Sequence, residues 1–241
     1  MNRLFLLILV LLLFTGGALA QDGVVLPALD ELDAGWNRLE PGGTTTCALG
    51  TPFVFFVRPA PETAPVEYHR LRQLIDRYAP ADKSIPVISG EWGYSAAWNG
   101  FDPVRQGKLL PRQWLTNLSQ DIPVSIWYDW HDDGQDPHEP EHHFGTVENQ
   151  EHRGRQPLYD PKPAYLAAKT LTATLAGYQF SKRIATGNHT TYALLFQKGE
   201  QQRLAVWTTG SEPIGVKIPS RDSRFEPISY TGESRPPVSA T

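Results

Sequence analysis

The chain has 241 residues, of which 40% are hydrophobic, and its formal net charge is −4. This composition is that of a globular protein with a real core, and it excludes a disordered or fibrous chain. No stretch concentrates Lys and Arg as phosphate binding requires, so we expect no nucleic-acid partner.

The first twenty residues have the pattern of a secretory signal peptide. Arg3 precedes an apolar run from Leu4 to Phe14, and Ala18-Leu19-Ala20 has the small residues of a cleavage site. The run is shorter than the ~20 apolar residues of a transmembrane helix. We therefore expect cleavage near Gln21, a secreted or periplasmic protein, and no membrane attachment afterwards. An uncleaved membrane anchor is the alternative.

Between residues 51 and 178 the hydrophobic pattern is typical of strands and helices in alternation. The predicted strands are residues 51–57, 85–89 and 123–128, and the predicted helices are residues 66–78, 104–118 and 164–176. A long polar loop is expected from Asp129 to about Pro161. Strands that alternate with helices favour a parallel sheet or barrel.

After Gly177 the pattern changes to short strands separated by polar turns. These strands are predicted at residues 180–184, 192–196, 203–207 and 214–218. Their spacing indicates a small antiparallel sheet or sandwich. The predicted organisation is a signal peptide (1–20), an α/β domain (21–178), a β-sheet domain (179–232) and a disordered tail (233–241).

Two features follow predicted strands, at the edge where parallel α/β folds place their chemistry. Glu91 lies between Gly90 and Trp92, and an aromatic run, Trp127-Tyr128-Asp129-Trp130, follows one βα unit later. A strand-end carboxylate could simply cap a helix or pair with Arg. The aromatic residues favour a sugar site, which needs a carboxylate pair and rings to hold the pyranose.

Three segments resemble the clan of retaining (β/α)8-barrel glycoside hydrolases that includes the family 5 cellulases. Residues 85–95 (IPVISGEWGYS) look like strand seven, residues 123–130 (PVSIWYDW) look like strand eight, and residues 160–165 (DPKPAY) resemble the start of the final barrel helix. The resemblance covers residues 53–178. It implies a barrel with a C-terminal β-domain, a carbohydrate substrate and hydrolysis of glycosidic bonds without a cofactor or metal.

The resemblance also implies roles for individual residues. The strand-seven Glu is the nucleophile of these enzymes, which maps to Glu91, and the strand-eight Trp is the floor of the sugar site, which maps to Trp127. The other residues expected to bind substrate are Trp92, Tyr94, Trp130, Asp132 and Asp133.

Two departures from the family pattern concern the proton donor and the length. The family's acid/base is a Glu that follows an Asn, and no Asn here is followed by Glu, so the acid/base is unknown. Gln21 to Tyr178 spans 158 residues, whereas a barrel takes about 250. Since residues 32–41 resemble the early-strand region, we expect a truncated barrel that lacks its middle. Substitute acids are Glu40, Glu62 and Glu141.

Two rival functions remain. A truncated, non-catalytic remnant could bind carbohydrate through its Trp residues. An extracellular metalloprotease is suggested by His138-Glu139-Pro140-Glu141-His142, which fits the H-E-x-x-H zinc motif. Pro140 disrupts the helix that this motif needs, so we interpret the segment as a solvated loop.

Cys47 is the lone cysteine, and we interpret it as a packing residue.

Overall fold

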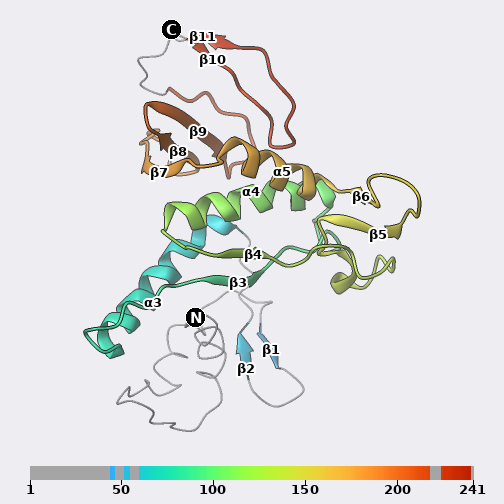
Figure 1. The fold of residues 1–241 in the computed structure, drawn as a ribbon, viewed down its shortest axis with the longest axis horizontal. Helices are drawn as coiled ribbons and strands as arrows, with labels where there is room; N and C mark the ends of the chain where they lie inside the picture. Colours follow the sequence, from blue (N-terminus) through green and yellow to red (C-terminus); the bar gives the residue numbers. More distant parts are fainter. Residues whose placement is uncertain (1–43, 47–51, 55–59, 218–223, 240–241) are drawn as a thin grey trace. The chain divides into compact units, whose positions relative to one another are not determined.

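The computed structural model describes residues 44–46, 52–54, 60–217 and 224–239 (Figure 1). The predicted signal peptide, Cys47, Glu40 and residues 32–41 lie outside the described residues. The chain divides into two compact units, of which one comprises Met1–Pro59 with Val66–Pro86 and the other comprises Ala60–Pro65 with Val87–Thr241. Each unit is described by itself.

In the first unit, β1 (Thr44–Thr46) and β2 (Pro52–Val54) pair antiparallel. The predicted strand at 51–57 thus contains β2. Most of α3 (Ala64–Tyr78) also belongs to this unit, and it confirms the helix predicted at 66–78. A short 3-10 helix, η1 (Pro61–Thr63), precedes α3.

The second unit begins with a parallel strand–helix–strand motif, as the alternating pattern predicts. It consists of β3 (Ser89–Trp92), α4 (Pro103–Ser119) and β4 (Ser125–Trp127). Asp102 caps α4 by accepting a hydrogen bond from the Arg105 backbone N–H. β3 begins where the predicted strand (85–89) should end, and Pro86, which has no N–H to donate to a ladder, lies in the apolar run before it.

The helix α5 (Pro163–Thr174) confirms the third predicted helix and packs on α4 (Figure 1). Their approach is close because Gly107 of α4 has no side chain: a Cβ there would lie 2.7 Å from Cβ of Pro163. Tyr94, Leu109, Leu110, Trp127 and Ala164 form the core between the strands and these helices.

The polar segment at 129–161 is not a simple loop, so that prediction was wrong in part. It contains a 3-10 helix, η2 (Pro140–His143), and an antiparallel pair, β5 (Val147–Glu151) and β6 (Tyr159–Pro161). Tertiary contacts explain the strand in this polar sequence. Val147 is buried, and its backbone N–H donates to the Trp130 carbonyl.

The C-terminal sheet has the order β7–β8–β9 and is antiparallel, as predicted. Its strands are β7 (Gln179–Arg183), β8 (Thr191–Lys198) and β9 (Gln201–Thr208). Leu194 and Phe196 of β8 form a core with Leu115 of α4. The elements on both sides of the predicted boundary at residue 178 therefore share a hydrophobic core.

Two predictions near the C-terminus were wrong. Residues 214–217 are not in a strand, and they include Gly215 between Ile214 and Val216. Residues 233–239, predicted as part of a disordered tail, include β11 (Val238–Ser239), which pairs antiparallel with β10 (Arg224–Phe225). Backbone pairing, which composition does not reveal, orders this polar segment.

The described part of the chain is a mixed α/β structure with five sheets of two or three strands. Its parallel pair, β3 and β4, is the part that corresponds to the predicted truncated TIM barrel, and the barrel itself stays a prediction. Within the same part of the chain, the helices are too short or too polar to cross a bilayer.

A glycine substitution tests the close approach of β3 and β4. A Cβ at Gly93 would lie 1.6 Å from the Tyr128 carbonyl oxygen, whereas one at Gly90 would meet nothing within 4 Å. We expect Gly93→Ala to lower the free energy of unfolding by about 1–3 kcal/mol because the backbone must move. Urea unfolding measures this, with Gly90→Ala as the control. Equal stabilities of the two variants would contradict this packing.

Candidate active site

Glu91 lies in β3, beside the end of the parallel strand β4. Trp92 is paired with Trp127 across the two strands. The Tyr128 backbone N–H donates to the Trp92 carbonyl at 3.3 Å, which continues the contact beyond β4. Glu91 is exposed to solvent. The parallel pair therefore brings the Glu91 backbone beside the aromatic run, as predicted, with the carboxylate free to meet a ligand.

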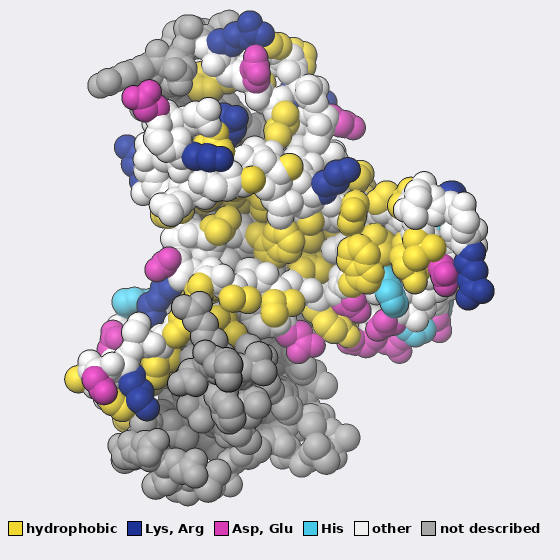
Figure 2. Space-filling model, viewed as in Figure 1, with side chains coloured by type: hydrophobic (Ala, Val, Ile, Leu, Met, Phe, Trp, Pro, Cys, Tyr) yellow, Lys and Arg dark blue, Asp and Glu magenta, His cyan; other side chains and the backbone are white. Residues whose placement is uncertain are grey.

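Four carboxylates lie near enough to Tyr128 for their charges to act on its hydroxyl group, and we call them the acidic surface: Glu91, Asp129, Asp133 and Glu141. Burial raises the Tyr128 pKa, and the negative charges of these four residues raise it further. The Tyr128 hydroxyl also donates to Glu141 at 3.4 Å. Figure 2 shows acidic and His side chains together on this side of the molecule, below β5.

Two glutamine side chains of α4 hold the backbone around Glu91. The Gln113 amide donates to the Trp92 carbonyl at 3.0 Å. The Gln106 amide donates to the carbonyls of Tyr94, His143 and Phe144 at 2.8, 2.9 and 3.1 Å. Both side chains are buried. Gln113 therefore holds the end of β3, and Gln106 ties the residues after β3 to the end of η2, which carries Glu141.

Sequence reasoning missed these two residues, although a signal was present. Gln106 and Gln113 are seven residues apart, so they lie on one face of α4, the face that also carries Leu109 and Leu110. A polar residue on an apolar helix face must find a hydrogen-bond partner when it is buried. Which backbone it binds is decided only by the fold.

Trp127 and Tyr94, predicted to hold a sugar, are buried in the structure. Trp127 is 9% exposed, and its indole N–H donates to the Phe144 carbonyl at 3.1 Å. Tyr94 is fully buried, with ring centroids 6.1 Å from Trp127 and 6.2 Å from Phe101. In this structure both rings form the core under the site rather than an open floor, because α4 and α5 cover them.

Asp132, predicted to contact a sugar, instead forms a buried ion pair. Its carboxylate accepts from the Lys162 Nζ at 2.7 Å and from the Gly145 backbone N–H at 2.8 Å. Both side chains are buried. Burial raises the pKa of Asp132, while Lys162, Gly145 and His143 act in the opposite direction. The pair fixes the segment after β4 to the start of α5.

The other predicted substrate-binding residues lie at the surface to different degrees. Trp92 is half-buried and packs against Tyr94 with ring centroids 6.2 Å apart. Trp130 is 58% exposed and lies edge-on to Tyr165 at 6.2 Å. Asp133 is exposed and belongs to the acidic surface. Of the aromatic residues predicted to bind sugar, Trp130 is thus the most open to a ligand.

The structure distinguishes the substitute acids that it describes. The Glu62 carboxylate forms hydrogen bonds away from the acidic surface. It accepts from the Arg112 guanidinium at 2.6 and 2.7 Å and from the Trp207 indole N–H at 2.6 Å. These bonds anchor η1 to α4 and β9. Glu141 is exposed and lies on the acidic surface.

The H-E-x-x-H segment does not form an α-helix. Pro140 begins η2, and Glu139 has an extended backbone. His142 and His143 contact the backbone of Asp136, at 3.3 and 2.8 Å. Among the described residues, no three His, Cys, Asp or Glu side chains are placed to hold one metal ion.

Comparison with known proteins gives one informative likeness. No family model and no curated protein matches the sequence. Among solved structures, the chain is similar to a family 39 glycoside hydrolase from the gut symbiont Bacteroides cellulosilyticus WH2, with a TM-score of 0.58 and 25% sequence identity. The match covers 70% of this chain and 33% of that one, so the chain spans a third of its length. The likeness supports a glycoside hydrolase fold, without selecting family 5.

The buried ion pair gives a pH-dependent prediction. In Lys162→Met, Asp132 loses its main opposing charge, so its folded pKa rises further above 3.8. A carboxyl with a raised folded pKa stabilises the fold at low pH and loses that contribution as the pH rises. We expect the variant to lose about 3–5 kcal/mol of unfolding free energy at neutral pH and less in acid.

Urea unfolding between acidic and neutral pH measures this difference. Lys169→Met is the matched control, because Lys169 is an exposed residue of α5, the helix that begins directly after Lys162. A loss in Lys162→Met that is the same at every pH would contradict the assignment of Asp132 as the responsible group.

Proposed function

We propose that the protein is a retaining glycoside hydrolase with Glu91 as its nucleophile. The observation that carries the proposal is an exposed carboxylate in β3, beside the aromatic end of the parallel strand β4. The likeness to a family 39 glycoside hydrolase supports the same reaction class. In this proposal, β3 and β4 correspond to strands seven and eight of a (β/α)8 barrel.

The mechanism follows from a pair of carboxyl groups. The Glu91 carboxylate attacks the anomeric carbon, while a second, protonated carboxyl group donates its proton to the leaving oxygen. Water then hydrolyses the glycosyl-enzyme, and the second group takes a proton from that water. Two inversions give net retention. Asp129, Asp133 and Glu141 share the acidic surface with Glu91 and are the described candidates for the second group.

Aryl glycosides with a good leaving group test the nucleophile separately from the acid. A dinitrophenolate leaves without a proton, so Glu91 alone can form the glycosyl-enzyme. We expect the full chain to release dinitrophenol and Glu91→Gln to lower the rate roughly a thousandfold or more, as loss of a nucleophile does. Glu212→Gln is the control, because Glu212 is exposed and outside the site.

The outcomes separate the rival functions. A burst of dinitrophenol without steady turnover shows a nucleophile that works without an effective acid/base. Carbohydrate binding without any release supports a non-catalytic binding protein and contradicts the proposal. Full activity in Glu91→Gln rejects Glu91 as the nucleophile.

We also propose that the protein is exported, on the basis of the charged, apolar and small-residue order of residues 1–20. N-terminal sequencing of the protein from the medium or periplasm checks this. We expect the mature chain to begin near Gln21. Recovery of the uncleaved chain from the membrane would show an anchor instead.

A further inference from the structure

A wide groove of about 3110 Å³ lies between the helices α4 and α5, the sheet β7–β9 and the C-terminal pair β10–β11. Its lining includes the aromatic residues Tyr178, Trp207, Phe225 and Tyr230. All of these elements belong to the second unit, so the groove is a feature of one compact body. It is distinct from the acidic surface, because the two have no residue in common.

The groove is basic although the protein as a whole is acidic. Of the residues that the structure describes, nine Lys and Arg line it, against two Glu. Three of the nine are ion-paired, Arg112 with Glu62, Arg224 with Glu226 and Arg235 with Glu233, which leaves six cations to give the groove its charge. The whole chain has 22 Lys and Arg against 26 Asp and Glu. Figure 2 shows Lys and Arg side chains spread over this part of the molecule. Such a separation of charge focuses a positive potential in the groove and attracts an anion.

Two of these cations lie together on one aromatic ring. The Lys198 Nζ is 5.8 Å and the Arg203 guanidinium carbon is 5.2 Å from the ring centre of Tyr178. Both side chains are exposed. Two positive charges beside one ring attract an anion to this place. The Tyr178 ring adds an apolar surface at the same place, which suits the face of a sugar.

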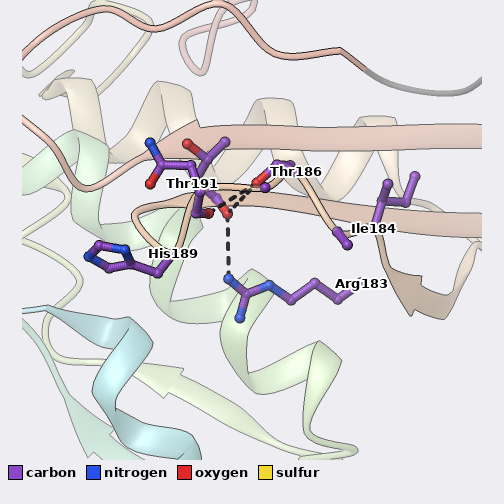
Figure 3. A pocket seen from close by; sticks show the side chains of 8 residues that line it. Arg183, Ile184, Thr186, His189 and Thr191 are labelled. Atoms are coloured by element: carbon purple, nitrogen blue, oxygen red, sulfur yellow. Dashed lines mark hydrogen bonds between the residues drawn. The ribbon is translucent and has the colours of Figure 1, made fainter.

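One end of the groove continues into a smaller pocket of about 340 Å³ at the β7–β8 turn (Figure 3). Arg183, Ile184 and Ala185 line both cavities. Figure 3 shows the Arg183 guanidinium directed at the Thr191 carbonyl, to which it donates at 3.4 Å. The Thr191 hydroxyl is buried beneath this pocket and has no hydrogen-bond partner among the described residues.

We propose that this groove binds an acidic polysaccharide, a chain of uronic-acid sugars, with the carboxylates at Lys198, Arg203 and Arg183 and a sugar face on Tyr178. Several cations along one groove suit a polymer with one carboxylate per sugar. The choice of a glycan over another polyanion rests on the proposed function. The groove then supplies the specificity of the protein for charged over neutral chains.

Titration calorimetry with hexagalacturonate on the full mature chain tests this proposal. We expect binding that weakens as salt screens the charges, and no binding of cellohexaose. The double variant Lys198→Gln, Arg203→Gln should bind hexagalacturonate at least roughly tenfold more weakly, because two charge-assisted contacts are lost. The control is Arg153→Gln, Lys169→Gln, which removes the same charge from exposed residues outside the groove.

Each other outcome overturns the proposal. If the affinity for hexagalacturonate falls equally in both double variants, the effect is one of net charge alone. If hexagalacturonate does not bind, the groove is not a site for this ligand. Equally tight binding of a thymidine hexanucleotide shows a general polyanion groove that does not select glycans. The test is independent of catalysis. A chain that cleaves aryl glycosides but does not bind hexagalacturonate contradicts this inference alone. A chain that binds hexagalacturonate but does not cleave aryl glycosides contradicts the proposed function alone.

Discussion

The Gln106 side chain holds the candidate site together. Its buried amide group donates to three backbone carbonyls, one after β3 and two at the end of η2. These two segments carry the flanks of Glu91 and Glu141, and they are remote in sequence. One helix side chain therefore fixes the spacing between the strand that presents one carboxylate and the turn that presents another. Apolar packing beneath, through Tyr94 and Trp127, makes the same geometry rigid.

Charge is divided between two regions of the second unit. Carboxylates lie near Tyr128. Burial raises the pKa of the Tyr128 hydroxyl, and the negative charges of these carboxylates raise it further. Lys and Arg gather in the groove between α5 and the C-terminal strands. The net charge of −4 conceals this division, because a sum over the whole chain does not show where charges of one sign gather. In the two proposals, the acidic surface performs the chemistry and the basic groove binds a charged polysaccharide.

The helices were predictable because each has a continuous apolar face and a clear boundary. Asp102 with Pro103 marks the start of α4, and Lys162 with Pro163 marks the start of α5. The strands were less predictable. β5 is polar apart from Val147 and depends on contacts with the β4 end, whereas residues 214–217 have an apolar pattern without a strand partner. Pairing is a property of two segments, and a pattern in one of them does not reveal the other.

The sequence by itself determined the three helices, the parallel strand pair that carries Glu91, and the aromatic character of the site, since these depend on local periodicity and on residue type. Only the tertiary structure decided which aromatic residues are open. Trp130 is exposed, while Trp127 is covered because α4 and α5 pack against it. Burial likewise turned Asp132 from a candidate ligand group into the partner of Lys162. The basic groove is also a tertiary feature, because its cations come from distant parts of the chain and meet only when those parts fold together.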